Sequence, residues 1–182
     1  MRHLITAATM ALTALPGIAQ AAQAPAEPPC LTAGEFTALA SYAMPSVING
    51  TVQRCTAALP ADAWLKRNGG ELVDRYAQLK PRVWPQAKAA FMKMGAGSTS
   101  NKEAADLMRG LPDTTLQPLV DGMVEGMIAQ KLPTERCATI DRLVRLLAPL
   151  PPENTAELVG MAVGLGSRSG NARVGSFAIC KP

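Results

Sequence analysis

Four cysteines carry the most specific chemistry in this 182-residue chain: Cys30, Cys55, Cys137 and Cys180. A cysteine can carry a lipid, act as a nucleophile, bind a metal or form a disulfide. Lipid attachment needs small residues directly before the cysteine, whereas two prolines and a glutamate precede Cys30. Metal and thiol-redox sites favour close pairs such as C-x-x-C, and these cysteines are widely spaced. We therefore expect two structural disulfides, and neither a metal nor a cofactor.

The four cysteines allow three pairings, among which a sequence alone does not decide. We favour Cys30–Cys55 together with Cys137–Cys180, because each bond would join a terminal segment to the nearest helical stripe. The first pair requires the chain to turn back at Pro45, so that Cys55 returns towards Cys30. Loop entropy discriminates little between the pairings, since it grows only with the logarithm of loop length.

Histidine is almost missing, and this limits the catalytic chemistry that the chain can support. His3 is the only one, so Ser-His-Asp triads, Cys-His pairs and histidine-bearing zinc sites lack their central residue. A catalytic role would then depend on carboxylates. Glu35 and Glu71 begin predicted helices, where the helix dipole lowers a carboxyl pKa, the wrong direction for a general acid. Asp121 and Glu125 lie four residues apart, as on an ordinary polar helix face.

Glycine and methionine gather in two of the predicted helices. The residues concerned are Gly122, Met123, Gly126, Met127, Gly160, Met161 and Gly164. A glycine inside a helix costs about 0.5–1 kcal/mol relative to alanine, which indicates close packing of helices within the domain. A ligand groove or a homodimer contact is the alternative, since flexible thioethers suit an adaptable binding surface as well as a core.

Apolar residues recur every three or four positions through most of the chain, which predicts helices. The predicted helices cover residues 32–44, 46–59, 62–67, 71–94, 100–108, 113–132, 133–147 and 154–165. Capping boxes at Thr32 and Ser100 start two of them, and a cap at Asn154 starts another. A break or sharp kink is expected at Pro45, between the first two helices, and a bend or restart is expected near Lys80. The predicted fold is an irregular all-α bundle of about six or seven helices, crosslinked by two disulfides.

The N-terminal segment has the features of a secretory signal peptide. A short basic start, an apolar run and the Ala19-Gln20-Ala21 box predict cleavage before Ala22. An uncleaved anchor is the alternative, but the apolar run is short for the roughly 20 residues that span a bilayer. We expect a signal peptide over 1–21, an extended leader over 22–31, a helical domain over 32–166 and a tail over 167–182 held by Cys180. The mature chain would be soluble, and periplasmic or secreted.

Charge and composition exclude some classes of partner, but they do not identify a function. The formal net charge is +4, with both signs interleaved, so no nucleic-acid surface is indicated. We predict a non-catalytic interaction or ligand-binding protein of the cell envelope, whose partner is an envelope protein or an apolar ligand and which could form a homodimer. The alternative is a carboxylate-dependent hydrolase acting on cell-envelope material. An exposed apolar groove along Leu116–Ile128 would favour binding, and exposed carboxylates converging in a cleft would favour the hydrolase.

Overall fold

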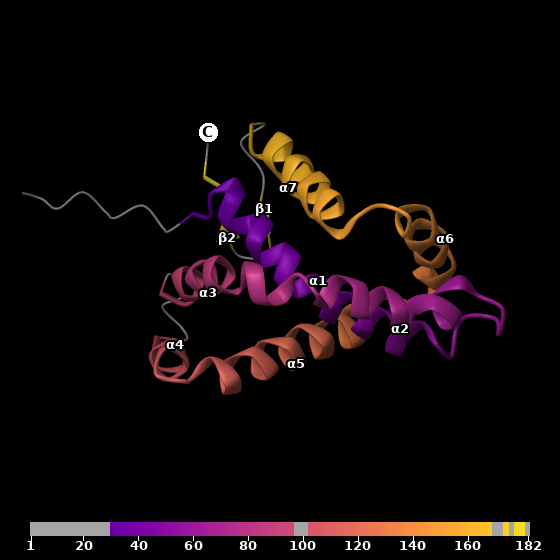
Figure 1. Ribbon diagram of the computed structural model, residues 1–182, viewed down its shortest axis with the longest axis horizontal. Coiled ribbons are helices and arrows are strands. Elements are labelled where there is room, and N and C mark those ends of the chain that lie inside the picture. The colour runs from indigo at the N-terminus through magenta and orange to yellow at the C-terminus, as the bar shows by residue number, and fades with distance from the viewer. Residues whose placement is uncertain (1–29, 97–101, 169–172, 175–176, 181–182) are drawn as a thin grey trace, which may run out of the picture.

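The computed structural model describes residues 30–96, 102–168, 173–174 and 177–180, and within these it is almost entirely helical (Figure 1). Its elements are α1 (Ala33–Cys55), α2 (Trp64–Ala77), α3 (Lys80–Ala96), α4 (Lys102–Arg109), α5 (Asp113–Lys131), the 3-10 turn η2 (Thr134–Arg136), α6 (Cys137–Leu147), α7 (Pro152–Arg168), β1 (Arg173–Val174) and β2 (Phe177–Ala178). The two short antiparallel strands lie in the tail. The predicted all-α bundle of about six or seven helices with two disulfides is confirmed, with seven α-helices in the described residues.

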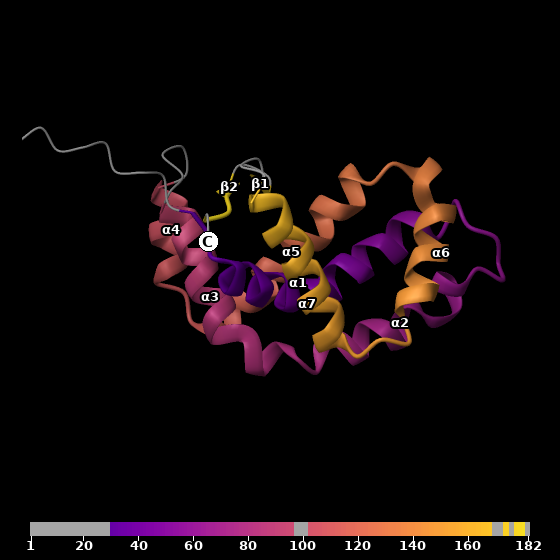
Figure 2. The same ribbon diagram turned by 90° about the horizontal axis from the view of Figure 1, so that it is seen from above.

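Helix α1 is the centre of the fold, and α2, α3, α5 and α7 all pack on it. Figure 1 shows α5 and α7 on opposite sides of α1, and Figure 2 shows α7 crossing above it. The core where α1, α3 and α5 meet contains Tyr42, Trp84, Ala87, Leu116 and Val120. The positions of these four helices are therefore set mainly by their contacts with α1, whereas α4 packs on α3 and α6 packs on α2.

The predicted break at Pro45 is wrong, because α1 continues unbroken through this residue. A proline inside a helix removes one backbone hydrogen bond and costs about 3 kcal/mol in an isolated helix. Pro45 is buried, and the apolar contacts of α1 with its neighbours outweigh that cost. The hydroxyls of Ser41 and Thr51 donate to carbonyls one turn earlier, at 2.7 Å each, and so remain satisfied inside the bundle.

The disulfides are Cys30–Cys180 and Cys55–Cys137, so the favoured pairing was wrong while the disulfide role of all four cysteines is confirmed. The unbroken α1 is the reason. Its 23 residues hold Cys55 about 33 Å from the start of the helix, at 1.5 Å per residue, far from Cys30. Cys55 instead faces Cys137 at the start of α6, and both side chains are buried.

Helix α2 also runs further than predicted. A helix ending before Gly69 and another starting at Glu71 were expected, whereas α2 is continuous across both glycines of Asn68-Gly69-Gly70. A Cβ built at Gly69 would lie 2.5 Å from Cγ2 of Val52 on α1. This glycine therefore allows α2 to pack closely on α1 rather than ending the helix.

Several helix starts lie within two residues of the predictions, whereas the helix predicted from Pro133 begins as α6 at Cys137, after the 3-10 turn. The helix expected to restart near Lys80 does begin there, as α3. Asp113 is the first residue of α5 and Pro112 occupies the N-cap. Helix α7 begins at Pro152, so Asn154 lies within its first turn instead of capping it. The predicted cap at Ser100 lies outside the described residues, although the helix that it would start is present as α4.

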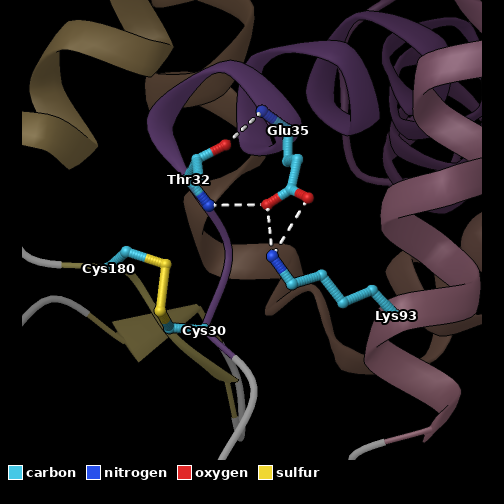
Figure 3. A network of polar contacts seen from close by, with 5 residues as sticks. All are labelled: Cys30, Thr32, Glu35, Lys93 and Cys180. Atoms are coloured by element: carbon cyan, nitrogen blue, oxygen red, sulfur yellow. Dashed lines mark hydrogen bonds and ion pairs between the residues drawn. A yellow bond between two sulfur atoms is a disulfide. The ribbon is translucent and has the colours of Figure 1, made fainter.

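The two ends of the described chain meet beside the start of α1 (Figure 3). The Thr32 hydroxyl accepts from the Glu35 amide at 3.2 Å, and the Glu35 carboxylate accepts from the Thr32 amide at 2.8 Å, which confirms the capping box. Lys93 of α3 donates to both carboxylate oxygens of Glu35, at 3.0 and 2.8 Å. Next to this network, the amide of Cys180 donates to the Leu31 carbonyl at 2.8 Å. The chain ends and α3 are thus fixed at one place.

Substituting glutamine for Glu35 is expected to lower the free energy of unfolding at pH 7 by about 1 kcal/mol. The hydrogen bond from Lys93 lowers the pKa of Glu35 below its usual value. A carboxylate with a lowered folded-state pKa stabilises the fold above its unfolded-state pKa, and this contribution disappears as the pH falls through the folded-state value. Urea unfolding of Glu35→Gln and wild type should therefore differ most near neutrality and converge on acidification. Glu157→Gln, on the exposed side of α7, is the control, and a difference that persists in acid would contradict the role of the charge.

Candidate interaction surface

One side of α5 is open to solvent and carries no ionisable residue. It consists of Pro118, Leu119, Gly122, Met123, Gly126 and Met127, here called the α5 outer face. Leu119, Met123 and Met127 are 42%, 54% and 47% exposed. Leu116 and Val120, which lie on the neighbouring part of the same helical stripe in the first half of α5, are buried in the core. The apolar stripe of α5 is thus only partly buried, because Leu116 and Val120 are in the core whereas Leu119, Met123 and Met127 are exposed, which is unusual for a helix surface.

Asp121 of α5 is directed into the protein rather than towards solvent. Its two carboxylate oxygens meet Lys80 at 2.5 Å and the Ser46 hydroxyl at 3.1 Å. The Lys80 ammonium also lies 4.6 Å from the centre of the Tyr42 ring, and burial together with the charge of Asp121 raises the pKa of Tyr42. This network ties α1, α3 and α5 together. The exposed polar face expected from Asp121 and Glu125 is therefore not formed, because Asp121 is engaged inside the bundle.

Within the described residues, Gly122 and Gly126 have no packing role. A Cβ built at either position meets no described atom within 4 Å, so close packing among these helices does not explain the two glycines. Close packing does explain Gly160 of α7, where a Cβ would overlap Thr37 of α1. It also explains Gly50 of α1, where a Cβ would lie 2.8 Å from the Glu125 carbonyl oxygen of α5. Gly50 was not singled out from the sequence, since a lone glycine in a helix gives no spacing signal.

The α5 outer face contains one row of apolar side chains and, beside it, one row of glycines that leave the helix backbone uncovered. Leu119, Met123 and Met127 recur every four residues and form a ridge, because residues at this spacing lie one above another on a helix. Gly122 and Gly126 form a parallel row with the same spacing. With no Cβ on the glycine row, the helix backbone is left bare beside the ridge.

Helix α7 has a second apolar surface. Leu158, Met161 and Leu165 are 45%, 53% and 65% exposed. A shallow groove of about 330 Å³ is lined by Leu150, Asn154, Glu157, Leu158 and Met161. Since α5 and α7 lie on opposite sides of α1 (Figure 1), the Gly- and Met-containing residues of the two helices form two separate surfaces. The surroundings of Gly164 lie outside the described side chains.

Three carboxylates have pKa values below their usual range. Lys93 lowers the pKa of Glu35 and Lys88 that of Asp113, each chiefly through a hydrogen bond. At Glu153 the backbone amide of the residue itself is the main cause, followed by Arg82. A general acid needs a raised pKa, so these three groups are suited to ion pairing rather than to proton donation.

No described helix is both long and apolar enough to cross a membrane. In the same part of the chain, no three histidine, cysteine or carboxylate side chains gather as they would around a metal ion.

Comparison with known proteins gives no family: no protein-family model, curated protein or solved structure matches this chain. The function must therefore be inferred from the chemistry and shape of the protein's surfaces, above all of the α5 outer face.

Proposed function

We propose that this protein is a non-catalytic, exported interaction protein of the cell envelope that binds protein partners through the α5 outer face. The observation that carries the proposal is the combination of exposed Leu119, Met123 and Met127 with an uncharged, partly bare helix surface. Scattered apolar side chains are normal on a protein surface. A continuous apolar row along about three turns of one helix is typical of an interaction site.

The chemistry of this face favours a helix as the bound element. Thioether side chains are flexible and polarisable, so Met123 and Met127 can adjust to the side chains of a partner. Helix-in-groove recognition uses apolar contacts at three- and four-residue spacing, the spacing of the ridge on α5. The inward position of Asp121, held by Lys80, keeps a charge away from this surface, so binding would bury few groups that need water.

The two disulfides support the exported location in this proposal. Disulfides persist in oxidising compartments such as the periplasm or the extracellular space, and they are rare in the cytosol. The predicted signal peptide, 1–21, lies outside the described residues, and the assignment to periplasm or medium depends on it.

Photocrosslinking in the producing cells tests the proposal. With a photoreactive amino acid at position 123, we expect crosslinked protein adducts in clear excess over the same substitution at Gln86, an exposed residue of α3. The captured protein is identified by mass spectrometry, purified, and titrated against the wild type and Met123→Lys. Placing a charge in an apolar contact should weaken binding about tenfold or more. Equal crosslinking at both positions, or unchanged binding of the lysine variant, would contradict the proposal.

A further inference from the structure

The net positive charge of the chain is concentrated at one end of the molecule. This end, here called the α6 end, surrounds the Cys55–Cys137 disulfide and consists of residues 54–67 and 131–145. One buried cluster holds these two segments together. They contain seven basic and three acidic side chains, whereas the rest of the chain contains eleven of each. The formal charge of +4 therefore arises at the α6 end.

The basic side chains of the α6 end are not used in ion pairs within the described residues. The ion pairs found there use six other basic side chains, namely Arg75, Lys80, Arg82, Lys88, Lys93 and Arg109. Asp141 of α6 accepts from the Leu65 amide at 2.6 Å and so serves the contact between α6 and α2. The other acids of the α6 end, Asp62 and Glu135, are exposed. Most of the positive charge at this end is therefore left uncompensated.

Helix α6 presents arginine and leucine side chains together to solvent. Its exposed side, here called the α6 outer face, contains Arg142, Leu143, Arg145 and Leu146. The two leucines are 54% and 63% exposed. Side chains three and four positions apart are neighbours on a helix, so the arginines adjoin the leucines. Cys137, by contrast, is buried in the core.

Helix α7 extends the apolar surface. Figure 1 shows α6 and α7 on the same side of α1, with α5 on the other side. Leu158 and Met161 of α7 line a shallow groove together with Leu150, which follows α6 in the chain. Glu157 also lines this groove and is its one acid. Apolar side chains thus continue from α6 through Leu150 to α7.

We infer that the α6 outer face binds the surface of an anionic phospholipid bilayer. Leu143 and Leu146 would enter the boundary between headgroups and acyl chains, as the apolar side of an interfacial helix does. Arg142 and Arg145 would lay their aliphatic stems over this boundary and donate hydrogen bonds from their guanidinium groups to lipid phosphates. The uncompensated charge of the α6 end attracts the same phosphates.

The combination of leucine with arginine favours a bilayer over other anionic partners. A single-stranded nucleic acid is bound by basic groups together with aromatic side chains that stack on the bases. On such a partner Leu143 and Leu146 would gain no comparable contact. A bilayer interface offers phosphate to the arginines and an apolar layer to the leucines. This surface is separate from the α5 outer face, so the inference does not depend on the protein-binding function proposed above.

Cosedimentation of the mature, disulfide-bonded protein with lipid vesicles tests the inference. Vesicles that contain phosphatidylglycerol should bind the protein more strongly than phosphatidylcholine alone, and added salt should weaken binding. Arg142→Gln combined with Arg145→Gln should lower the partition coefficient about tenfold or more, since each basic side chain contributes about fivefold. Leu143→Gln combined with Leu146→Gln should lower it about tenfold. Glutamine is a good helix former, and circular dichroism should show unchanged helix in both variants.

The matched control is Lys88→Gln combined with Arg109→Gln, which lowers the net charge by the same amount. Both side chains form ion pairs on α3 and α4, at the opposite end of the molecule from α6 (Figure 1). Partitioning should change less than about twofold, because charges beyond a Debye length are screened. Absence of binding to phosphatidylglycerol vesicles at low salt, or an equal loss in the control, overturns the inference. Binding that is insensitive to the leucine substitutions also overturns it and indicates an anionic polymer or protein instead. Crosslinking from position 123 tests the proposed function separately.

Discussion

Replacing Cys55 and Cys137 together by alanine is expected to lower the free energy of unfolding by about 4–5 kcal/mol. The bond closes a loop over a sequence separation of 82 residues, and loop entropy alone gives about 4.5 kcal/mol as a model-dependent upper value. Both side chains are also buried, among Leu59, Ala63 and Leu65, so the substitution removes packed atoms as well. Urea unfolding followed by circular dichroism measures the loss.

The matched variant for comparison lacks the other disulfide, Cys30–Cys180. Cys30 and Cys180 are separated by 150 residues, so loop entropy alone predicts a loss of about 5 kcal/mol, slightly larger than for the first bond. Both residues are only partly buried, and we expect their loss mainly to release the chain ends. The Cys55/Cys137 variant should therefore be the less stable of the two. An unchanged urea midpoint for that variant would show that α6 is held on the bundle without the covalent bond.

Gly50→Ala is expected to destabilise the protein by about 2 kcal/mol, although alanine is the better helix former. The new Cβ would lie 2.8 Å from the Glu125 carbonyl oxygen and 3.1 Å from the Ile128 Cβ. The first of these atoms is backbone, so the contact cannot be relieved by a change of rotamer. Helices α1 and α5 would have to separate, which loosens the core between them. Thermal and urea unfolding of the variant measure this effect.

The control for Gly50→Ala is a glycine of α5, the helix that Gly50 contacts. Gly122→Ala places the same methyl group on α5 in open space, and should raise the free energy of unfolding of the monomer by about 0.5–1 kcal/mol. The two substitutions are chemically identical, so opposite signs would isolate the packing effect from helix propensity. A stabilised Gly50→Ala would mean that α1 and α5 are further apart than the structure shows.

Local sequence features predicted most of the helical content. The restart at Lys80 and the capping box of Thr32 and Glu35 were both recognised from the sequence, and both are formed. Such features depend on residues within one or two turns of each other, so a short window contains the information that they need. The apolar stripe of α5 was likewise evident from its periodicity, although only part of it, including Leu116 and Val120, is buried.

Features that depend on contacts between distant residues were predicted poorly. Pro45 and the glycines of α2 were expected to end helices, because local propensity disfavours them there. Their helices continue because packing on several sides supplies more free energy than a proline or a glycine costs. The rigid α1 that results then determines the disulfides, since it carries Cys55 away from Cys30 and towards Cys137.

The sequence by itself determined the all-α class, the use of all four cysteines in disulfides and the amphipathic core of the bundle. The tertiary structure alone decided which cysteines pair, which glycines are packed and which are bare, and that Asp121 points inwards. The physical reason is that helix propensity and periodicity are local, whereas pairing and exposure depend on which helices meet. Gly122, Met123, Gly126 and Met127 were named from the sequence as a possible binding surface, but only the packing showed that Leu119, Met123 and Met127 are exposed and that Lys80 and Ser46, distant in sequence, hold Asp121 inside the bundle.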